Sequence, residues 1–474
     1  MVDAHDGLRI LQVNTADNFG GAARVAWNLH QGYRERGHHS WLVVGQRVNN
    51  APDVFTIPND HRRRGLARIA DAAGNVLTPL VGKVRGVGRI RNLINTFGDP
   101  SRWWSLRMGH EDFDFPGTWR VPALAGERPD VVHCHNLHGG YFDLRVLPWL
   151  SRQFPVVLTL HDAWLISGHC AHSFDCERWK TGCGECPDLT IYPAIRRDAT
   201  AFNWQRKQRI YAQSRLYVTA PSRWLIQKVE QSMLVPSIVK YKVIHNGIDL
   251  SVFTPADRNT VRASLGIPQD AKVLLFAANC VRGNIWKDYA TMRAAIEEVS
   301  RRLQGQDVLF IALGEDAGWE RIGHARIHFV AYQKDPAVVA RYYQAADVYL
   351  HAARADTFPN SVLEALACGV PVVATAVGGI PEQVHDSETG FLIPPGDVGA
   401  MSERLVQLLL NKGMKEALGD KAAQDARARF DLRQQVDATL EWYQEILRAE
   451  RRGVDVNGTE TSSRLVNDAA TSAA

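Results

Sequence analysis

Leu8-Arg-Ile-Leu-Gln-Val13 and the loop after it, Asn14-Thr-Ala-Asp-Asn-Phe-Gly-Gly21, set the fold of the first half of the chain. The first segment has the β-rich character of a strand. After the two glycines, apolar residues recur at helical spacing, and Trp41-Leu-Val-Val-Gly45 predicts a second strand. A strand, a glycine loop, a helix and a strand in this order form a βαβ unit. Such a unit requires a parallel sheet covered by helices.

The same alternation of apolar strands and helices continues along the chain. Further strands are predicted at residues 130–135, 155–160, 216–220, 242–245, 273–277, 308–313, 327–330, 348–350, 370–375 and 390–393. Two Rossmann-like, doubly wound α/β domains are the simplest solution, and we place them at residues 1–255 and 256–430, with a C-terminal helix at 431–452. Ligands of such sheets bind at the carboxyl ends of strands, so we expect the site in a cleft between the domains.

Composition excludes several other classes of protein. Of 474 residues, 45% are hydrophobic and 22% charged, which is typical of a globular protein and not of a disordered or fibrous one. The net charge of +4 is too small to indicate nucleic-acid binding. No apolar run approaches the roughly 18–20 residues that span a bilayer, and the first residues lack a signal-peptide pattern. We therefore expect a cytoplasmic protein, with a disordered tail at residues 453–474.

A basic insertion interrupts the α/β pattern at residues 60–110. Between residues 61 and 93 there are eight Lys or Arg residues and one acid, interleaved with apolar residues. A basic amphipathic segment of this kind can lie on an anionic membrane surface. A solvated helical insertion explains the same pattern, and both interpretations stay open.

A cysteine-rich segment covers residues 161–190, where four of the seven cysteines gather: Cys170, Cys176, Cys183 and Cys186. Persistent disulfides are rare in the cytosol, and four sulfur ligands suit a structural zinc ion. His169 or His172 could replace one of the four. The alternatives are reduced cysteines packed as small hydrophobic residues, or a disulfide. A second pair, His133-x-His135, lies on one face of a strand; we expect it to line the cleft, because two ligands alone make no metal site.

Residues 356–373, Asp-Thr-Phe-Pro-Asn-Ser-Val-Leu-Glu-Ala-Leu-Ala-Cys-Gly-Val-Pro-Val-Val, carry the clearest chemical pattern. They predict a loop, a short helix that begins near Asn360 and ends at Gly369, and a buried strand. The amino end of a helix presents unpaired N–H groups and so favours a phosphate. Glu364, one turn inside, could accept hydrogen bonds from a ribose diol. In the alternative, Ser361 and Glu364 form a capping box and serve only the helix.

The spacing Asp356-x7-Glu364 resembles the E-x7-E signature of glycosyltransferase family 4. Further matches, in order along residues 8–450, are Gly20-Gly21, Ala220-Pro-Ser222, Val243-Ile-His-Asn-Gly-Ile-Asp249, Ala345-Ala-Asp347, Val377-Gly-Gly-Ile-Pro-Glu382 and Thr389-Gly-Phe-Leu-Ile-Pro-Pro-Gly-Asp397. The Phe-Pro-Asn variant and the cysteine-rich segment are similar to bacterial exopolysaccharide enzymes of the colanic-acid type. The resemblance implies the GT-B fold, in which two Rossmann-like domains face each other across a cleft.

The resemblance also implies roles for individual residues. Asp356 would touch the hydroxyls of the donor sugar and His161 the reaction centre. The other implied donor contacts are Gly20, Gly21, Arg282, Lys287, Phe358, Pro359, Asn360 and Glu364. Arg24 could help to bind an anionic acceptor. Asp356 departs from the family, because the first acid of the signature is usually Glu, which is one methylene longer; this leaves the donor sugar undecided.

These implications add up to a retaining hexosyltransferase. It would move a hexose from a UDP- or GDP-sugar to a saccharide, in particular a lipid-linked one, in exopolysaccharide or other cell-surface glycan synthesis. We expect no cofactor to be required for catalysis, zinc being at most structural, and the basic segment would seat the enzyme on the inner membrane. Two alternatives stay open: a nucleotide-sugar epimerase of the same fold, and a non-catalytic, zinc-bearing scaffold of a polysaccharide assembly complex. A sugar phosphorylase would need a pyridoxal lysine motif, which we do not find.

Overall fold

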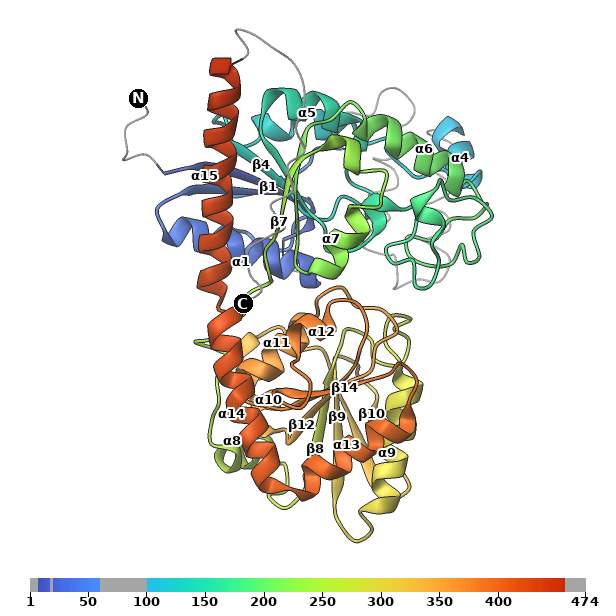
Figure 1. Cartoon of the computed structure of the whole chain (residues 1–474), viewed down its shortest axis with the longest axis vertical. Coiled ribbons are helices and arrows are strands. Elements are labelled where there is room, and N and C mark those ends of the chain that lie inside the picture. The colour runs from blue at the N-terminus through green and yellow to red at the C-terminus, as the bar shows by residue number, and fades with distance from the viewer. Residues whose placement is uncertain (1–6, 18–19, 60–99, 457–474) are drawn as a thin grey trace, which may run out of the picture.

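The computed structural model describes residues 7–17, 20–59 and 100–456. Two α/β domains lie one above the other, each with a central sheet between helices (Figure 1). The basic run at 61–93 and most of the predicted tail, from residue 457 on, lie outside the described residues. None of the described helices combines the length and the apolar character that crossing a bilayer requires.

The N-terminal domain has a seven-stranded parallel sheet in the order β3-β2-β1-β4-β5-β6-β7. Its strands are β1 (Arg9–Ala16), β2 (His39–Gln46), β3 (Val54–Thr56), β4 (Val131–Cys134), β5 (Val156–Thr159), β6 (Leu216–Ala220) and β7 (Ile238–Val243). Its α-helices are α1 (Gly21–Glu35), α4 (Pro100–Arg107), α5 (Leu147–Gln153), α6 (Thr200–Tyr211) and α7 (Arg223–Val229). The predicted βαβ unit at residues 8–45 is confirmed, because β1 pairs in parallel with β2 across α1.

The C-terminal domain has a second seven-stranded sheet, in the order β10-β11-β9-β8-β12-β13-β14. Its strands are β8 (Lys272–Ala277), β9 (Val308–Leu313), β10 (Gly318–Ile322), β11 (Ala325–Val330), β12 (Val348–His351), β13 (Val372–Thr375) and β14 (Gly390–Ile393). Its helices are α8 (Arg258–Leu265), α9 (Tyr289–Arg302), α10 (Pro336–Ala345), α11 (Asn360–Ala367), α12 (Ile380–Gln383), α13 (Val398–Leu410) and α14 (Lys412–Arg429). All neighbouring strands are parallel except β10 and β11.

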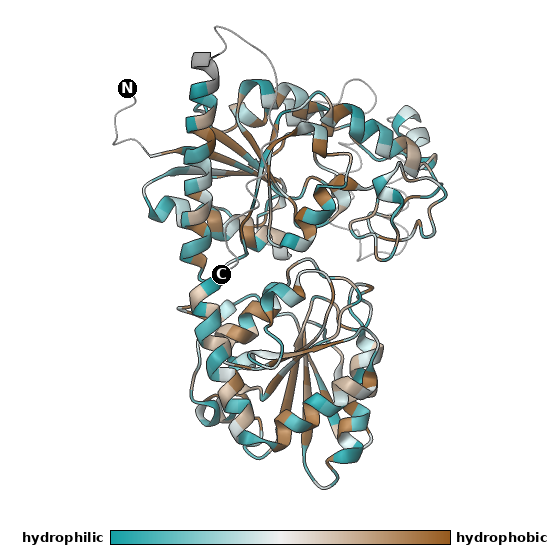
Figure 2. Cartoon of the chain, viewed as in Figure 1, coloured by the Kyte–Doolittle hydropathy of each residue, from teal (hydrophilic) through white to brown (hydrophobic). Residues whose placement is uncertain are grey.

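The central strands and the edge strand β14 agree with the sequence prediction, whereas the edge strands β3, β7 and β10 were not predicted at their observed positions. The strand predicted at 242–245 is observed earlier, as β7, where Val239 and Tyr241 are exposed. Edge strands such as β3, β7 and β10 have one side in water, so they lack the continuous apolar run that marks a buried parallel strand. Figure 2 shows the strands inside both domains as the most hydrophobic elements, with polar residues on the outer helices.

The chain passes between the domains twice, and the two passages are joined by a bridge between Ile248 and Asp431. Ile248 and Phe253 already pack in the C-terminal core, so the first passage lies a few residues before the predicted boundary at 255. After α14, helix α15 (Leu432–Val456) returns to cover the N-terminal domain beside α1 (Figure 1). It continues past the predicted end at 452, into the first residues of the predicted tail.

Helix α15 is bound to the N-terminal domain by aromatic side chains. Trp442 and Tyr443 are almost completely buried in a cluster with residues of β1, α1, β4, β5 and β6. The Tyr443 hydroxyl lies 3.0 Å from that of Tyr33 and 2.5 Å from Nδ1 of His133. Helix α15 is therefore part of the N-terminal domain's core.

Candidate active site

A cavity of about 290 Å³ lies between the two domains at the carboxyl ends of their strands. Gly20, Gly21 and Arg24, at the start of α1, form its N-terminal wall. On the C-terminal side the loops after β8, β9, β11 and β12 and the first turn of α11 line it; seven of the predicted donor and catalytic residues meet here, namely Gly20, Gly21, Lys287, Asp356, Pro359, Asn360 and Glu364. Gly20 has φ +90°, a conformation that glycine adopts without strain. The structure thus brings together residues that are more than 300 positions apart.

Lys287, His351 and Asp356 form a charged cluster in the wall of this cavity. The Lys287 ammonium forms an ion pair with Oδ2 of Asp356. His351, at the carboxyl end of β12, places Nε2 3.1 Å from the same oxygen and 3.3 Å from the Lys287 nitrogen. Lys287 and His351 both contact Oδ2 of this carboxylate, so Oδ1 is the oxygen that remains for a ligand.

The protonation states of this cluster follow from its surroundings. Burial acts to raise the pKa of Asp356, but the Lys287 charge and the His351 hydrogen bond outweigh it and hold this pKa well below its usual range. Burial, with a contribution from the Lys287 charge, lowers the pKa of His351 to about 4. At neutral pH the cluster therefore holds an aspartate carboxylate and a neutral imidazole.

Glu364 lies one turn inside α11 and is nearly buried. Helix α11 begins at Asn360 with Pro359 as its N-cap and without a side-chain cap, so the alternative capping box with Ser361 does not form. Burial raises the pKa of Glu364, while the nearby charge of Arg24 acts to lower it. The glutamate faces the cavity from the C-terminal domain, and its cationic neighbour belongs to the N-terminal domain.

Two predicted donor contacts lie outside this cavity. Arg282 is in the loop after β8, but its side chain is half-exposed, with Nε 2.5 Å from Oε1 of Glu315 and the guanidinium over the ring of Phe329. Phe358 is buried and stacks on His245 at 5.2 Å, in the passage between the domains. Neither side chain lines the cavity, although Asn284 and Pro359, which lie close to them in the sequence, do.

His161, the predicted catalytic histidine, also does not line the donor cavity. Nε2 of His161 is 3.1 Å from Nδ1 of His135, and burial lowers the pKa of His161 to about 4. His133 and His135 do share a face of β4, but the expectation that they line the cleft is wrong, because both side chains are buried. They point to the inside of the domain, where His133 contacts Tyr443 and His135 contacts Gln12.

Two family models match the chain. The model described as Glycosyltransferase Family 4 matches residues 19–252, and the model described as Glycosyl transferases group 1 matches residues 271–411. The chain belongs to the glycosyltransferases of the family 4 type. The first match covers the N-terminal wall of the cavity, and the second covers the wall that contains Lys287 and Glu364.

Individual relatives agree with this membership. The chain is 33% identical over 220 residues to a D-inositol 3-phosphate glycosyltransferase of Mycolicibacterium paratuberculosis (strain ATCC BAA-968 / K-10), which is 45% of this chain and 49% of the relative. The match therefore spans about half the length of that curated relative. The glycosyl transferase WcaC of Escherichia coli (strain K12), named for colanic acid biosynthesis, is 25% identical over 453 residues, 93% of this chain and 100% of WcaC.

Solved structures show the same fold. Anabaena Alr3699/HepE, solved in complex with UDP-glucose, superposes with a TM-score of 0.55 at 17% identity, over 91% of this chain and 99% of HepE. WaaG, a glycosyltransferase involved in lipopolysaccharide biosynthesis, gives the same TM-score of 0.55 over 91% of this chain and 98% of its own. This glycosyltransferase therefore has the GT-B fold that the resemblance implied.

The four clustered cysteines of this glycosyltransferase are free thiols in the structure. Burial raises the pKa of Cys170 to about 11 and that of Cys183 to about 12, and Nε2 of His169 lies 3.4 Å from the Cys186 sulfur. Within residues 7–17, 20–59 and 100–456, no three His, Cys, Asp or Glu side chains are arranged to hold a metal ion. As they are arranged, these side chains do not fit a closed tetrahedral zinc site. The zinc site stays a prediction, which elemental analysis of the purified protein would test.

Sequence reasoning missed several side chains of the cleft. His351 directly follows the predicted strand 348–350, and Tyr332 and Gln333 follow the predicted strand 327–330. The rule that ligands meet the carboxyl ends of strands could have found all three. His138 and His172, which line a neighbouring cavity, lie in long loops where no such rule applies.

Proposed function

We propose that this protein transfers a hexose from a UDP- or GDP-sugar to a hydroxyl of a saccharide, with retention of the anomeric configuration. One observation carries the proposal: Lys287, Glu364 and the amino end of α11 converge on a single cavity between the domains. A nucleoside diphosphate needs a cation and N–H donors for its phosphates and an acceptor for its ribose hydroxyls. These three features supply them.

The phosphates would lie between Lys287 and the first turn of α11. The N–H groups of Asn360 and Ser361 are in this turn, where a helix favours negative charge. As the bond to the sugar breaks, charge grows on the leaving diphosphate. Fixed donors and cations stabilise that charge most effectively where water is excluded.

The ribose and the sugar would each meet one carboxylate. Glu364 can accept hydrogen bonds from two neighbouring ribose hydroxyls, because an ionised carboxylate offers acceptors only. Oδ1 of Asp356 would accept from a hydroxyl of the transferred hexose, while Lys287 and His351 hold Oδ2. We assign no protein nucleophile; in the family the leaving phosphate is thought to help to remove the acceptor's proton on the same face.

Similarity to named proteins supports the choice of substrates. HepE was solved with UDP-glucose, and WcaC is named for colanic acid biosynthesis. We therefore place this protein in the assembly of a cell-surface saccharide, with UDP as the first nucleotide to test and a lipid-linked saccharide as the acceptor.

A membrane surface is the proposed location of the reaction. The run at 61–93 carries eight basic residues and one acid, which suits anionic lipid. It leads into α4, where Trp103 and Trp104 are 38% and 59% exposed. Tryptophan is favoured at the boundary between lipid and water. Co-sedimentation with vesicles of phosphatidylglycerol should fall when Arg62, Arg63, Arg64 and Arg68 are changed to Gln, and unchanged binding would contradict the proposal.

The reaction itself is tested with radiolabelled UDP- and GDP-sugars, with and without saccharide acceptors. We expect transfer only when an acceptor is present. Formation of an isomerised nucleotide sugar without acceptor would favour an epimerase. Nucleotide binding without any turnover would favour a scaffold.

A further inference from the structure

Glu382 of the C-terminal domain contacts the backbone of the N-terminal domain. It lies in α12, and each of its two carboxylate oxygens accepts one main-chain N–H at 2.8 Å, from Arg223 and from Trp224. These two residues begin α7, which follows β6 in the other domain. The carboxylate therefore joins the two domains by a pair of hydrogen bonds.

Helix α7 has a cap of its own besides Glu382. Ser222 is its N-cap, and the Ser222 hydroxyl accepts the N–H of Leu225 at 3.3 Å. The N–H groups of Arg223 and Trp224 come earlier in the helix, where no intrahelical acceptor exists. If the domains moved apart, both N–H groups and the carboxylate would return to water. Because hydrogen bonds to an ionised carboxylate are stronger than those to a neutral acceptor, Glu382 favours the arrangement in which the domains are in contact.

The backbone of α12 is fixed to the C-terminal domain. The Arg429 guanidinium donates to the carbonyl of Glu382 at 2.8 Å and to that of Gln383 at 3.1 Å. Gln383 is completely buried, and its side-chain amide donates to the carbonyl of Pro359 at 3.0 Å. Pro359 is the N-cap of α11, whose first turn lines the donor cavity between the domains. Glu382 is therefore held in a helix that also contacts the start of α11.

The turn before α12 contacts the loop that carries Asp356. Gly378 has φ +57°, and a Cβ there would lie 1.7 Å from the carbonyl oxygen of Asp356. Gly379 donates its N–H to the same oxygen at 3.3 Å. A Cβ on Gly379 would lie 2.0 Å from the carbonyl oxygen of Thr357 and 2.9 Å from the Cβ of Ser222. The two glycines thus let the turn pass between the Asp356 loop and the start of α7, in contact with both.

Three of the motifs found in the sequence meet at this contact and do not line the donor cavity. They are Ala220-Pro-Ser222, Val243-Ile-His-Asn-Gly-Ile-Asp249 and Val377-Gly-Gly-Ile-Pro-Glu382. The first and second are joined where Nδ1–H of His245 donates to the carbonyl of Pro221 at 2.8 Å. The His245 ring then stacks on Phe358, in the same loop as Asp356. All three motifs can therefore act on the site through the relative position of the domains.

We infer that Glu382 is a positioning residue for sugar transfer. By accepting the two N–H groups of α7, it holds the N-terminal wall of the cleft in place against the Asp356 loop. The inference rests on the proposed function. In that function the nucleotide contacts Lys287 and Glu364 of the C-terminal domain, whereas transfer needs both walls. Loss of Glu382 should therefore lower kcat and leave the nucleotide affinity nearly unchanged.

Glu382→Ala, made in the full chain, removes both acceptors. We expect kcat with the radiolabelled UDP- or GDP-sugars to fall about 10–100-fold, because a small misplacement of reacting groups can cost about 10²-fold. The affinity for UDP or GDP, measured by calorimetry, should stay within about twofold. Small-angle X-ray scattering should give a larger radius of gyration than for the wild type. Glu382→Gln keeps one carbonyl acceptor and should recover part of kcat.

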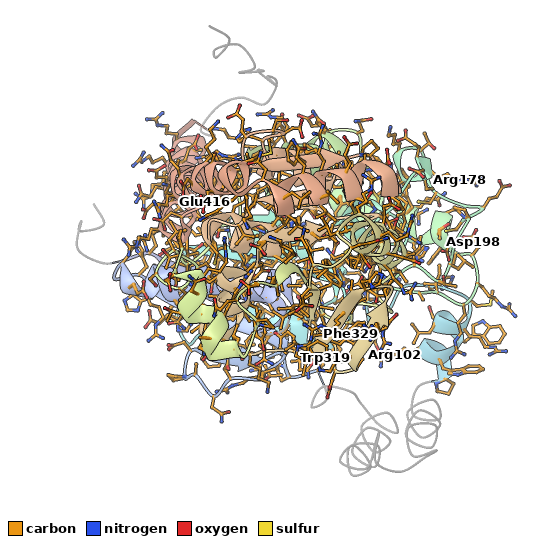
Figure 3. The ribbon with its side chains drawn as sticks, turned by 90° about the horizontal axis from the view of Figure 1, so that it is seen from below. Arg102, Arg178, Asp198, Trp319, Phe329 and Glu416 are labelled. Atoms are coloured by element: carbon orange, nitrogen blue, oxygen red, sulfur yellow. The ribbon has the colours of Figure 1, made fainter. Side chains whose placement is uncertain are left out.

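The matched control is Glu416→Ala. Glu416 lies on α14 with its side chain 52% exposed, and it pairs with Lys412 at 3.7 Å in the same helix (Figure 3). Its loss removes a carboxylate of the same domain without touching α7. We expect wild-type kcat, nucleotide affinity and radius of gyration for this variant.

A proline at position 223 tests the contact from the other domain. Proline has no N–H and suits the first position of a helix, and the extended Ser222 (φ −140°, ψ 149°) can precede it. Arg223→Pro should therefore keep the melting temperature, remove one of the two hydrogen bonds and lower kcat. Arg223→Ala keeps the N–H and should retain more of kcat. Added to Glu382→Ala, which already lacks the acceptors, Arg223→Pro should have little further effect.

Several results would overturn the inference. One is wild-type kcat in Glu382→Ala, and another is a full additional loss when Arg223→Pro is added. Equal falls in kcat and nucleotide affinity would mean that Glu382 acts on the donor cavity itself. A lower melting temperature of Glu382→Ala, with wild-type kinetics in Arg223→Pro, would mean that the contact serves only stability. If the wild type transfers no sugar, the proposed function fails, whereas the scattering comparison still tests whether Glu382 holds the domains together.

Discussion

The two walls of the cleft are built on sheets of the same type but differ in how the chain reaches the site. In the C-terminal domain, β12 ends at His351, Asp356 follows five residues later, and α11 begins at Asn360. In the N-terminal domain, β5 ends at Thr159 and α6 begins only at Thr200. Asp162 and His172 lie in that long connection. A short connection fixes where a side chain points, whereas a long one leaves this to tertiary contacts.

The largest expected effect is on the C-terminal wall. Changing Lys287 to Ala removes the cation beside the proposed diphosphate, so sugar transfer should fall about 10²–10³-fold, as for other fixed donors to a developing negative charge. The affinity for UDP or GDP should fall as well, as measured by calorimetry. Lys412→Ala is the matched control, because Lys412 is 83% exposed and pairs with Glu416 on α14.

A double substitution distinguishes the loss of donor binding in Lys287→Ala from a loss of stability. The single change leaves the Asp356 carboxylate, whose side chain is only 17% exposed, with His351 alone, which costs stability. Lys287→Ala combined with Asp356→Ala should recover the melting temperature without recovering transfer. If the double variant is both stable and active, the C-terminal wall does not bind the donor as proposed.

This contrast also explains what could be predicted from the sequence. The family resemblance singled out Lys287, Asp356 and Glu364, and the structure places all three at one cavity. For the two acids the resemblance coincides with a local pattern, because Asp356 follows the end of β12 and Glu364 lies at the start of α11. His161 follows β5 at its carboxyl end, so we expect it too to lie near the cleft. Its ring contacts His135, which in turn contacts His133 on the same strand. The partners of these histidines, such as Tyr443, are hundreds of residues away, and no local pattern reveals them.

Tyr443 tests how far the N-terminal wall depends on such distant contacts. Tyr443→Phe keeps the ring but leaves the Tyr33 hydroxyl and the His133 ring without this partner. We expect the free energy of unfolding to fall by about 1–3 kcal/mol, the range for buried polar groups that lose a hydrogen bond. Urea unfolding measures it. Tyr241→Phe is the control. Tyr241 is 43% exposed, so the loss of its hydroxyl should cost well under 1 kcal/mol. Equal effects would mean that α15 adds little to this wall.

The free energy of unfolding at acid pH should depend on the protonation of the Asp356 cluster. The pKa of Asp356 is lower in the folded protein than its unfolded value of about 3.9. The unfolded chain therefore binds more protons below that pH. The associated stability is complete above about pH 5 and is lost as the pH falls toward the folded pKa, by at most about 1.4 kcal/mol per pH unit. In Asp356→Asn the slope of unfolding free energy against pH below pH 4 should flatten. Asp316→Asn, an exposed control, should keep the wild-type slope.

The smallest effect is expected for His161, and it compares the two walls directly. Because this ring contacts His135 and does not line the donor cavity, His161→Asn should leave the affinity for UDP or GDP within about twofold of the wild type. Transfer can fall by more, since the family places this histidine near the sugar and not near the nucleotide. Calorimetry and initial rates on the same preparation separate the two quantities. A loss of nucleotide affinity as large as that of Lys287→Ala would contradict this expectation. It would mean that the N-terminal wall closes onto the nucleotide when the donor binds, so that both walls contact it.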